Sequence, residues 1–195
     1  MDDRLERLSV PPPCRAAISA WLGLLREWNA RIDLTAARTD DELYDLMLAD
    51  ALVLSDRTNI ADGARVIDVG TGAGAPGLAL ALLRPDLKIT LVEPLTKRIA
   101  FLRTVLGTVG RTDIVLVRDR GDAVAKKEGR AWDVALSRAT LAPDEWLPLG
   151  LSLASSTWVL LAKETPPAGE VVVKEHTYEW PLTKVSRRVV LYERR

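Results

Sequence analysis

The sequence is poor in the residues that most often carry nucleophilic or metal chemistry. Its 195 residues include one cysteine, Cys14, and one histidine, His176. A single cysteine excludes an intrachain disulfide and a cysteine-rich zinc cluster, and a single histidine excludes a multi-histidine metal site. No second histidine is present to serve a serine or cysteine nucleophile elsewhere in the chain. The chemistry of this protein therefore has to come from other residue types.

The chain also lacks a long apolar run and a net charge. No segment approaches the length of a membrane span, and the first ten residues, MDDRLERLSV, are too acidic and polar for a secretory signal. We therefore expect a cytoplasmic protein. The 27 basic residues balance 27 acidic ones, so overall charge gives no argument for a nucleic-acid partner. Local basic clusters, such as Lys97/Arg98 and Arg187/Arg188, still allow a basic face that holds RNA.

The most informative segment is a glycine-rich turn that follows a short apolar run, VIDVGTGAGAPG at residues 66–77. Glycine has no Cβ and tolerates positive φ, so such a loop brings its backbone unusually close to a ligand. The helix expected after the loop offers unpaired N–H groups at its first turn. The segment therefore predicts a buried strand that ends in a nucleotide- or nucleoside-binding loop.

Two ligand classes fit the spacing of these glycines. Residues 72–77 match the dinucleotide fingerprint G-x-G-x-x-G, and Glu93 follows at about the distance where an acid would bind a ribose. S-adenosylmethionine (SAM) is bound by a G-x-G-x-G loop, here residues 70–74. Asp68 favours SAM, because a carboxylate there would repel a pyrophosphate but attract ammonium and sulfonium cations. Pro76 also lacks an N–H that a phosphate would use.

From Ala64 onward, apolar runs alternate with helical stretches, which predicts an α/β fold with a doubly wound, mostly parallel sheet. Its ligand should lie at the carboxyl ends of the central strands. Residues 1–62 are expected to form a helical extension packed on the sheet, and residues 63–195 the main domain. The expected strands are 66–69, 89–92, 114–117, 133–136 and 158–161, with an antiparallel pair at 171–173 and 189–192. The expected helices are 41–54, 77–83, 146–155, one entered after Pro11-Pro12-Pro13, and one through 99–106 closed by Gly107 and Gly110.

These motifs together resemble the RsmG (GidB) family, bacterial SAM-dependent methyltransferases of Rossmann-like fold that modify N7 of a guanine in 16S ribosomal RNA. The strongest segments are residues 68–77, then LVEPLTKR at residues 91–98, followed by Phe101-Leu102. Weaker support comes from Trp28-Asn29, Leu34-Thr35-Ala36, Ser137-Arg138-Ala139, Leu161-Ala162-Lys163, Pro181-Leu182 and Arg187-Arg188. The resemblance covers the chain from about Trp28 to Leu191.

The resemblance implies SAM as the cofactor, 16S ribosomal RNA as the partner, and a set of site residues. Glu93 would take the ribose hydroxyls, and Gly121 and Asp122 would lie beside the adenine. Arg138 would face both the cofactor and the target base, and Lys163 would lie near the RNA, which makes these two the candidate catalytic residues. The candidate cofactor-binding residues are Asp68, Gly70, Gly72, Gly74, Ala75, Glu93, Gly121, Asp122 and Arg138.

The chain departs from the family pattern on the side expected to face the substrate. Where the family has His-x-x-Asp-Ser, residues 47–51 are Met-Leu-Ala-Asp-Ala, so that only Asp50 remains. Asp33 replaces an asparagine, Ala75 replaces a bulky apolar residue, and Glu164 replaces the glycine of a Lys-Gly pair. The glycine loop keeps its pattern, so the cofactor is better supported than the target.

Guanine N7 methylation needs little from the side chains, because N7 carries a lone pair and no proton. The protein has to align the reactants in a prepared site, and an arginine suits the edge or face of a guanine. Other functions remain open: a SAM-dependent enzyme with another substrate, a catalytically silent SAM-binding module, or a dehydrogenase. We expect a monomer that binds neither a metal nor a membrane.

Overall fold

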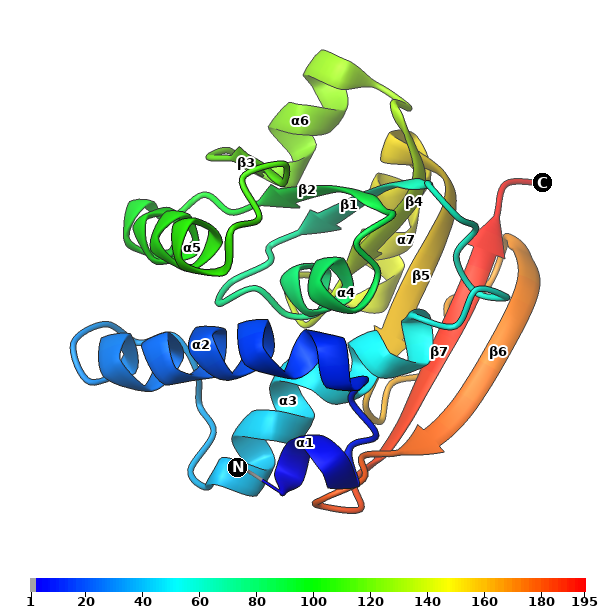
Figure 1. The fold of residues 1–195 in the computed structure, drawn as a ribbon. Helices are drawn as coiled ribbons and strands as arrows, with labels where there is room; N and C mark the ends of the chain where they lie inside the picture. The colour runs from blue at the N-terminus through cyan, green and yellow to red at the C-terminus, as the bar shows by residue number, and fades with distance from the viewer. Residues whose placement is uncertain (1–2) are drawn as a thin grey trace.

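A seven-stranded sheet runs through the computed structural model, which describes residues 3–195 (Figure 1). The strands lie in the order β3-β2-β1-β4-β5-β7-β6. The first five run parallel to one another, whereas β7 is antiparallel to β5 and β6 is antiparallel to β7. The strand bounds are β1 Arg65–Val69, β2 Lys88–Val92, β3 Val115–Val117, β4 Trp132–Ser137, β5 Ala154–Leu161, β6 Val171–Glu179 and β7 Ser186–Glu193.

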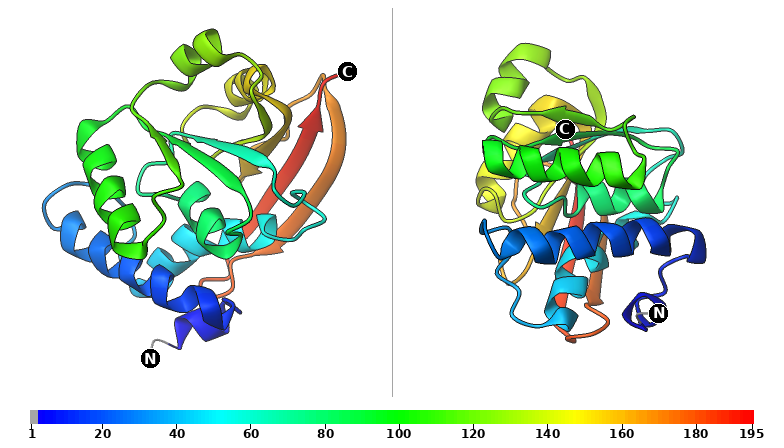
Figure 2. Two further views of the ribbon diagram at one scale, coloured as in Figure 1. Left: turned by 45° about the horizontal axis from the view of Figure 1, so that its top comes forward. Right: turned by 60° about the vertical axis from the view of Figure 1, so that its left-hand side comes forward.

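Helices cover both faces of this sheet. One face carries α4 (Gly77–Leu83) and α5 (Thr96–Val109), and the other carries α6 (Gly121–Glu128) and α7 (Pro143–Leu153). The N-terminal helices are α1 (Arg4–Arg7), α2 (Pro12–Asn29) and α3 (Asp40–Leu54). Figure 2 shows α2 running alongside α5, outside the layer of α4 and α5. The N-terminal helices therefore add a further layer to one face of the sheet.

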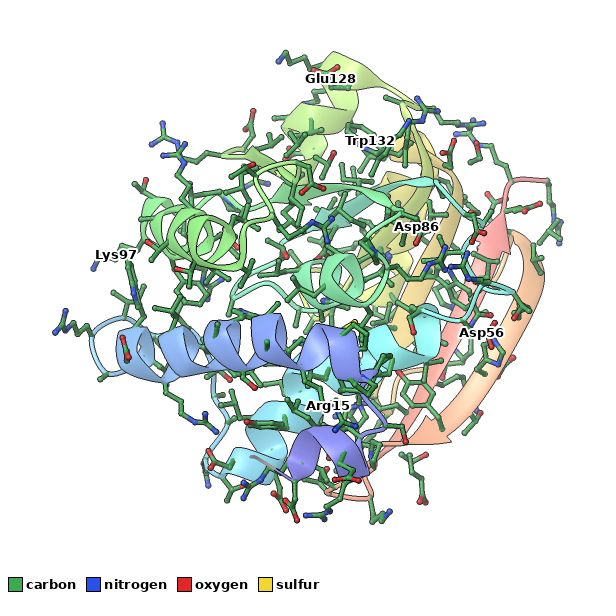
Figure 3. The ribbon with its side chains drawn as sticks, viewed as in Figure 1. Arg15, Asp56, Asp86, Lys97, Glu128 and Trp132 are labelled. Carbon is green, nitrogen blue, oxygen red and sulfur yellow. The ribbon has the colours of Figure 1, made fainter. Side chains whose placement is uncertain are left out.

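The local sequence explains where several helices begin and end. Pro12 opens α2 at a position where the missing N–H costs nothing. The Thr39 side chain accepts a hydrogen bond from the Glu42 N–H and so caps α3. Gly110 ends α5 with a φ of 70°, in the left-handed region that glycine tolerates. Charged side chains such as Lys97 and Glu128 project away from the body of the molecule (Figure 3).

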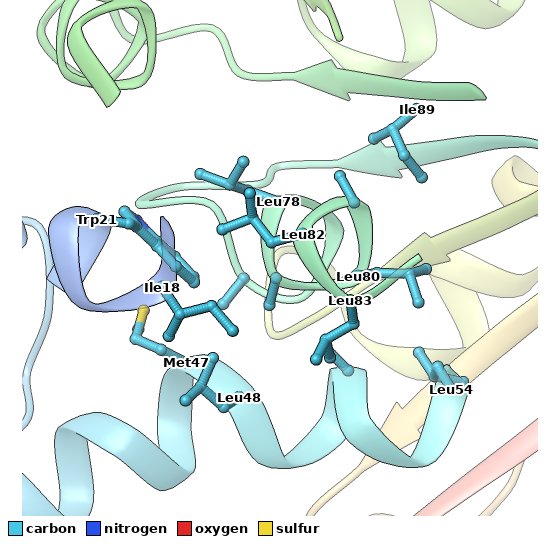
Figure 4. Close-up of a cluster of buried hydrophobic side chains, with 14 of the residues drawn as sticks. Ile18, Trp21, Met47, Leu48, Leu54, Leu78, Leu80, Leu82, Leu83 and Ile89 are labelled. Carbon is cyan, nitrogen blue, oxygen red and sulfur yellow. The ribbon is translucent and has the colours of Figure 1, made fainter. Parts of the chain in front are cut away.

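The hydrophobic core joins the N-terminal helices to the sheet. Leucines of α4 pack between the strands and the side chains of α2 and α3, as Figure 4 shows for Ile18, Trp21, Leu48 and Leu78. A second apolar cluster fills the opposite face under α6 and α7. Successive residues of the central strands belong alternately to one cluster and the other, as expected for a sheet that is buried on both faces.

The predicted strand and helix order is confirmed, with differences at the element ends. The expected helix 146–155 is wrong at its end, because residues 154–157 already pair with β4 as part of β5. The terminal antiparallel pair is longer than expected, since β6 runs to Glu179 with a polar, half-buried alternation. Gly107 lies inside α5, so Gly110 alone closes that helix. The sequence did not predict α6, whose eight residues contain one buried apolar side chain.

None of the helices in residues 3–195 combines the length and the apolar character that crossing a membrane requires.

Candidate active site

The carboxyl ends of β1, β2 and β4 open onto two adjoining cavities. The loop cavity has a volume of about 540 Å³ and lies over the glycine loop. The α6 cavity, about 330 Å³, lies beside the start of α6. Gly70, Pro94 and Thr140 line both cavities, so the two are adjacent. The main lining residues of the loop cavity are Gly70, Thr71, Gly72, Ala73, Ala75, Glu93, Leu95, Arg98, Arg138 and Thr140.

The backbone of the glycine loop has the conformation that the sequence predicts. Gly70, Gly72 and Gly74 all have positive φ, of 72°, 59° and 109°. A Cβ on Gly70 would overlap the Thr140 side chain, and a Cβ on Gly74 would lie 2.9 Å from Leu78. Both the φ values and the lack of space therefore require glycine here.

Helix α2 supports the loop from outside. The Trp21 indole N–H donates a hydrogen bond of 3.0 Å to the Ala73 carbonyl oxygen, and the Trp21 side chain is fully buried. This bond fixes the middle of the loop to the N-terminal layer.

Glu93 is a buried carboxylate at the end of β2 that lines the loop cavity. Its Oε2 accepts a hydrogen bond from the Gly72 N–H (3.1 Å), and its Oε1 accepts one from the Leu95 N–H (2.9 Å). The Arg98 guanidinium lies 3.6 Å from Oε2. Each oxygen has a second lone pair, so Glu93 holds the loop and can still accept hydrogen bonds from a ligand hydroxyl.

Asp68 lies beneath the loop and does not line either cavity. Its side chain is fully buried, and Oδ2 accepts a 2.8 Å hydrogen bond from the Gly77 N–H at the start of α4. Burial raises the pKa of the Asp68 carboxyl to about 6. The predicted cofactor residue thus joins β1 to α4, and direct contact with a cofactor stays a prediction.

Gly121 and Asp122 lie at the start of α6 and line the α6 cavity. A Cβ on Gly121 would lie 2.5 Å from the Val69 side chain, so the close approach of α6 to β1 requires glycine. The Asp122 carboxylate is exposed and accepts a 2.9 Å hydrogen bond from the Arg120 Nε. The structure therefore places the two residues beside the α6 cavity, whereas Ala75 lines the loop cavity.

Arg138, just after β4, lies in the wall between the loop cavity and a third cavity. This hairpin cavity, about 170 Å³, lies between β5, the β6–β7 hairpin and α3. The Arg138 Nη1 donates to the Leu46 carbonyl oxygen and lies 3.2 Å from the Asp50 Oδ2. The main lining residues of the hairpin cavity are Leu46, Asp50, Arg138, Leu141, Pro143, Glu164, Tyr178, Trp180 and Arg187.

Two aromatic side chains of the hairpin complete the surroundings of Asp50. The Tyr178 hydroxyl and the Trp180 indole N–H both donate to Asp50 Oδ1, at 2.8 and 2.9 Å. The Arg187 guanidinium lies over the Trp180 ring, 4.0 Å from its centroid. Burial and the neighbouring Asp50 carboxylate raise the pKa of the Tyr178 hydroxyl far above its ordinary value.

Lys163 lies apart from the loop and hairpin cavities. Its exposed side chain follows β5 and lines a surface groove of about 330 Å³, together with Arg187 and Arg188. This basic groove shares Ala162, Glu164 and Arg187 with the hairpin cavity, so the two are adjacent. The catalytic role predicted for Lys163 stays a prediction, and its position favours contact with a large substrate.

His176 has a structural environment, away from the cavities. Its ring Nε2 lies 2.9 Å from the Asn59 Oδ1, and the ring stacks on Trp158. Among residues 3–195, no three His, Cys, Asp or Glu side chains are grouped in a way that would hold a metal ion.

Comparison with known proteins identifies the family. The family model described as rRNA small subunit methyltransferase G matches residues 15–192. The chain belongs to this family. A protein named ribosomal RNA small subunit methyltransferase G from Anaeromyxobacter dehalogenans is 33% identical, with 96% of this chain and 92% of that protein covered. The protein of the same name from Clostridium beijerinckii is 39% identical over 61% of this chain, and that match spans 51% of the relative.

Solved structures agree on the Rossmann-like methyltransferase fold. A putative methyltransferase from Escherichia coli gives a TM-score of 0.55 at 19% identity, covering 75% of this chain and 84% of that chain. A putative RNA methyltransferase from Pyrococcus horikoshii gives a TM-score of 0.56 at 13% identity, covering 91% and 98%.

The family and the fold imply SAM as the methyl donor, and the residues present fit that molecule. A Cβ on Gly72 would meet no atom closer than 3.9 Å, so at this position the missing side chain leaves open space beside the loop cavity. The Thr71 hydroxyl, beside the loop cavity, is buried and interacts with the Asp68 carboxyl beneath the loop. Buried Glu93 adds a carboxylate suited to hydroxyl groups, and the adjacent loop and α6 cavities offer places for the two ends of an elongated ligand.

Sequence reasoning missed several residues that line the hairpin cavity. Asp50 was seen only as the remnant of a family motif, and Tyr178 and Trp180 were not singled out. The predicted strand 171–173 ends before Tyr178, so the sequence did not place Tyr178 on a strand. The Asp50 motif was the one signal available, since its partners lie 128 and 130 residues away in the chain.

Proposed function

We propose that this protein transfers a methyl group from SAM to N7 of a guanine in 16S ribosomal RNA, as a monomer in the cytoplasm. The observation that carries the proposal is the position of Arg138 in the wall shared by the loop cavity and the hairpin cavity. One guanidinium there can contact a cofactor on one side and a target base on the other.

The loop and α6 cavities are assigned to the cofactor. Gly70, Gly72 and Ala75 would line its methionine end, Glu93 would accept its ribose hydroxyls, and Gly121 would lie beside its adenine. When bound, SAM supplies an electrophilic methyl group on a sulfonium. Arg98, 3.6 Å from the Glu93 Oε2, places a positive charge beside that carboxylate.

The hairpin cavity is assigned to the target base. Its aromatic walls, from Tyr178 and Trp180, suit a flat base that has left its stack. Arg138 has the donors that a guanine O6 edge requires. Insertion of the base from the side of Arg187 would direct its N7 edge toward the loop cavity.

The titratable groups of the hairpin cavity favour a nucleophile that carries no proton. The Asp50 oxygens already accept three hydrogen bonds, and the raised pKa keeps the Tyr178 hydroxyl protonated at neutral pH. The backbone N–H groups of Glu164 itself, Ala162 and Lys163 lower the pKa of the Glu164 carboxyl, which makes it a weak base. Guanine N7 needs no base, because its lone pair attacks directly and the S–C electron pair leaves with sulfur.

The basic groove beside the hairpin cavity is assigned to the RNA backbone. Lys163, Arg187 and Arg188 line it, and Glu175 pairs with Arg188 at 3.2 Å. Phosphate contacts of this kind position a nucleic acid without reading its sequence. The groove would hold the chain on either side of the target nucleotide while its base enters the hairpin cavity.

Methyl transfer from labelled SAM to total RNA of cells that lack this protein tests the proposal. We expect label in 16S RNA at one guanine, converted to 7-methylguanine and mapped by cleavage at that base. Arg138→Ala should lower kcat/KM by on the order of a hundredfold, because Arg138 aligns both reactants. Arg65→Ala is the control, since Arg65 pairs with Asp133 at the opposite end of the strands.

Label at another atom or in another molecule would show that the target is wrong. Absence of label from every cellular RNA, with SAM still bound, would show a silent SAM-binding module instead.

A further inference from the structure

Asp50 is a buried carboxylate whose two oxygens serve different partners. Oδ1 accepts the hydrogen bonds of Tyr178 and Trp180, which hold the hairpin against α3. Oδ2 faces the Arg138 guanidinium at 3.2 Å. The Asp50 side chain is 4% exposed and that of Arg138 18%. The ion pair is therefore largely shielded from solvent. Charges in such a buried place interact more strongly than charges at the surface.

The charge of the cofactor assigned to the loop cavity gives this ion pair a functional consequence. SAM carries a positive sulfonium, and Arg138 is a cation that lines the same cavity. A guanidinium without a counter-charge would repel the sulfonium in this partly desolvated place. After methyl transfer the sulfur of S-adenosylhomocysteine is neutral, so the repulsion would act on the substrate form of the cofactor alone.

We propose that Asp50 is a positioning residue that neutralises Arg138, so that the loop cavity accepts the sulfonium form of the cofactor while Arg138 stays at the boundary with the target. The inference rests on the proposed function for its cofactor. The inference explains why α3 carries a buried acid at position 50.

A second buried acid on α3 allows the electrostatic role to be separated from the structural one. Asp45 also anchors the hairpin: it accepts hydrogen bonds from the Leu182 N–H and from the N–H and hydroxyl of Thr183. Asp45 is fully buried, as Asp50 nearly is, but it does not contact Arg138. Removal of its charge should loosen the hairpin turn and leave the loop cavity unchanged.

The test is the affinity of the whole purified protein for SAM and for S-adenosylhomocysteine, measured by titration calorimetry. In Asp50→Asn, the amide oxygen can keep the bonds from Tyr178 and Trp180, while the amide nitrogen faces Arg138 without a charge. We expect the Kd for SAM to rise on the order of tenfold and the Kd for S-adenosylhomocysteine to change less than about twofold. Asp45→Asn should lower the Tm and change neither Kd.

The double variant D50N/R138Q tests the cause directly. If repulsion by Arg138 weakens SAM binding, removal of that cation should restore the wild-type ratio of the two affinities. An equal loss of both ligands in Asp50→Asn, no loss of either, or a ratio that the double variant fails to restore would overturn the inference. A wild-type protein that binds neither ligand would overturn the proposed function, and the inference with it.

Discussion

Two buried carboxylates at neighbouring strand ends have different surroundings and, we infer, different tasks. Glu93 opens onto the loop cavity and accepts hydrogen bonds at both oxygens. Asp68 is enclosed beneath the loop; its Oδ2 accepts one backbone N–H, and the Thr71 hydroxyl is its one further hydrogen-bonding neighbour among the residues that the structure describes. An ionised carboxylate with so few donors is costly to bury, which accounts for the raised pKa of Asp68.

The raised pKa of Asp68 predicts a specific pH dependence of stability. The pKa of the Asp68 carboxyl is about 6 in the folded protein, against an ordinary value of 3.8 for an aspartate in the unfolded chain. Between these values the folded state holds a proton that the unfolded state has released. The contribution of Asp68 to the free energy of unfolding should therefore fall as pH rises from 4 to 6, by about 2 kcal/mol. Urea unfolding of the wild type and Asp68→Asn from pH 4 to 7 measures the difference.

Parallel stability curves for the two proteins would contradict this account. Asp86→Asn provides a control of opposite sign. The Arg84 guanidinium lowers the pKa of the Asp86 carboxyl, so the stability that Asp86 contributes is present above pH 4 and is lost as pH falls. Between pH 4 and 7 the contribution of Asp86 is therefore nearly constant, whereas that of Asp68 falls as pH rises.

At the level of elements, α2 acts as an external support for the glycine loop. Trp21→Phe should lower the free energy of unfolding by about 2 kcal/mol, because the buried Ala73 carbonyl loses its donor and a gap forms beside Gly74. The Kd for SAM should rise, since the loop backbone loses the contact that holds it. Urea unfolding and titration calorimetry provide the two measurements.

Trp28→Phe on the same helix is the matched control. The Trp28 ring packs edge to face on Phe101 of α5, remote from the loop. It should lower stability without changing SAM affinity. Equal effects of the two substitutions on affinity would show that α2 supports the fold in general, not the loop in particular.

The sequence predicted the elements in which one local pattern decides the structure. Residues 66–77 could be interpreted because glycines that need positive φ, an apolar strand and a following helix all lie within one short segment. β6 was underestimated because its inner residues, such as His176 and Tyr178, are polar or amphipathic and alternate with exposed ones. The role of Arg138 was predicted, but its partner Asp50 was not, because that contact depends on how α3 packs against the sheet.

At the scale of the whole molecule, the proposed boundary at residues 62/63 divides a shared core. Side chains from α1 to α3 and from the sheet form one apolar cluster. We therefore predict that residues 63–195 alone do not fold to a cooperative structure, because the leucines of α4 would be exposed. Near-UV circular dichroism and thermal unfolding of the fragment, beside the full chain, measure this. A sharp transition in the fragment would show an independent domain and contradict the prediction.

The two sides of the site differ in how far apart in the chain their contacts lie. The bonds that shape the loop span 9, 21 and 52 residues, whereas those at Asp50 span 88, 128 and 130. Contacts close in sequence form at a lower cost in chain entropy, so they form earlier. We therefore expect the loop cavity, which we assign to the methyl donor, to form before the hairpin cavity, which we assign to the methyl acceptor.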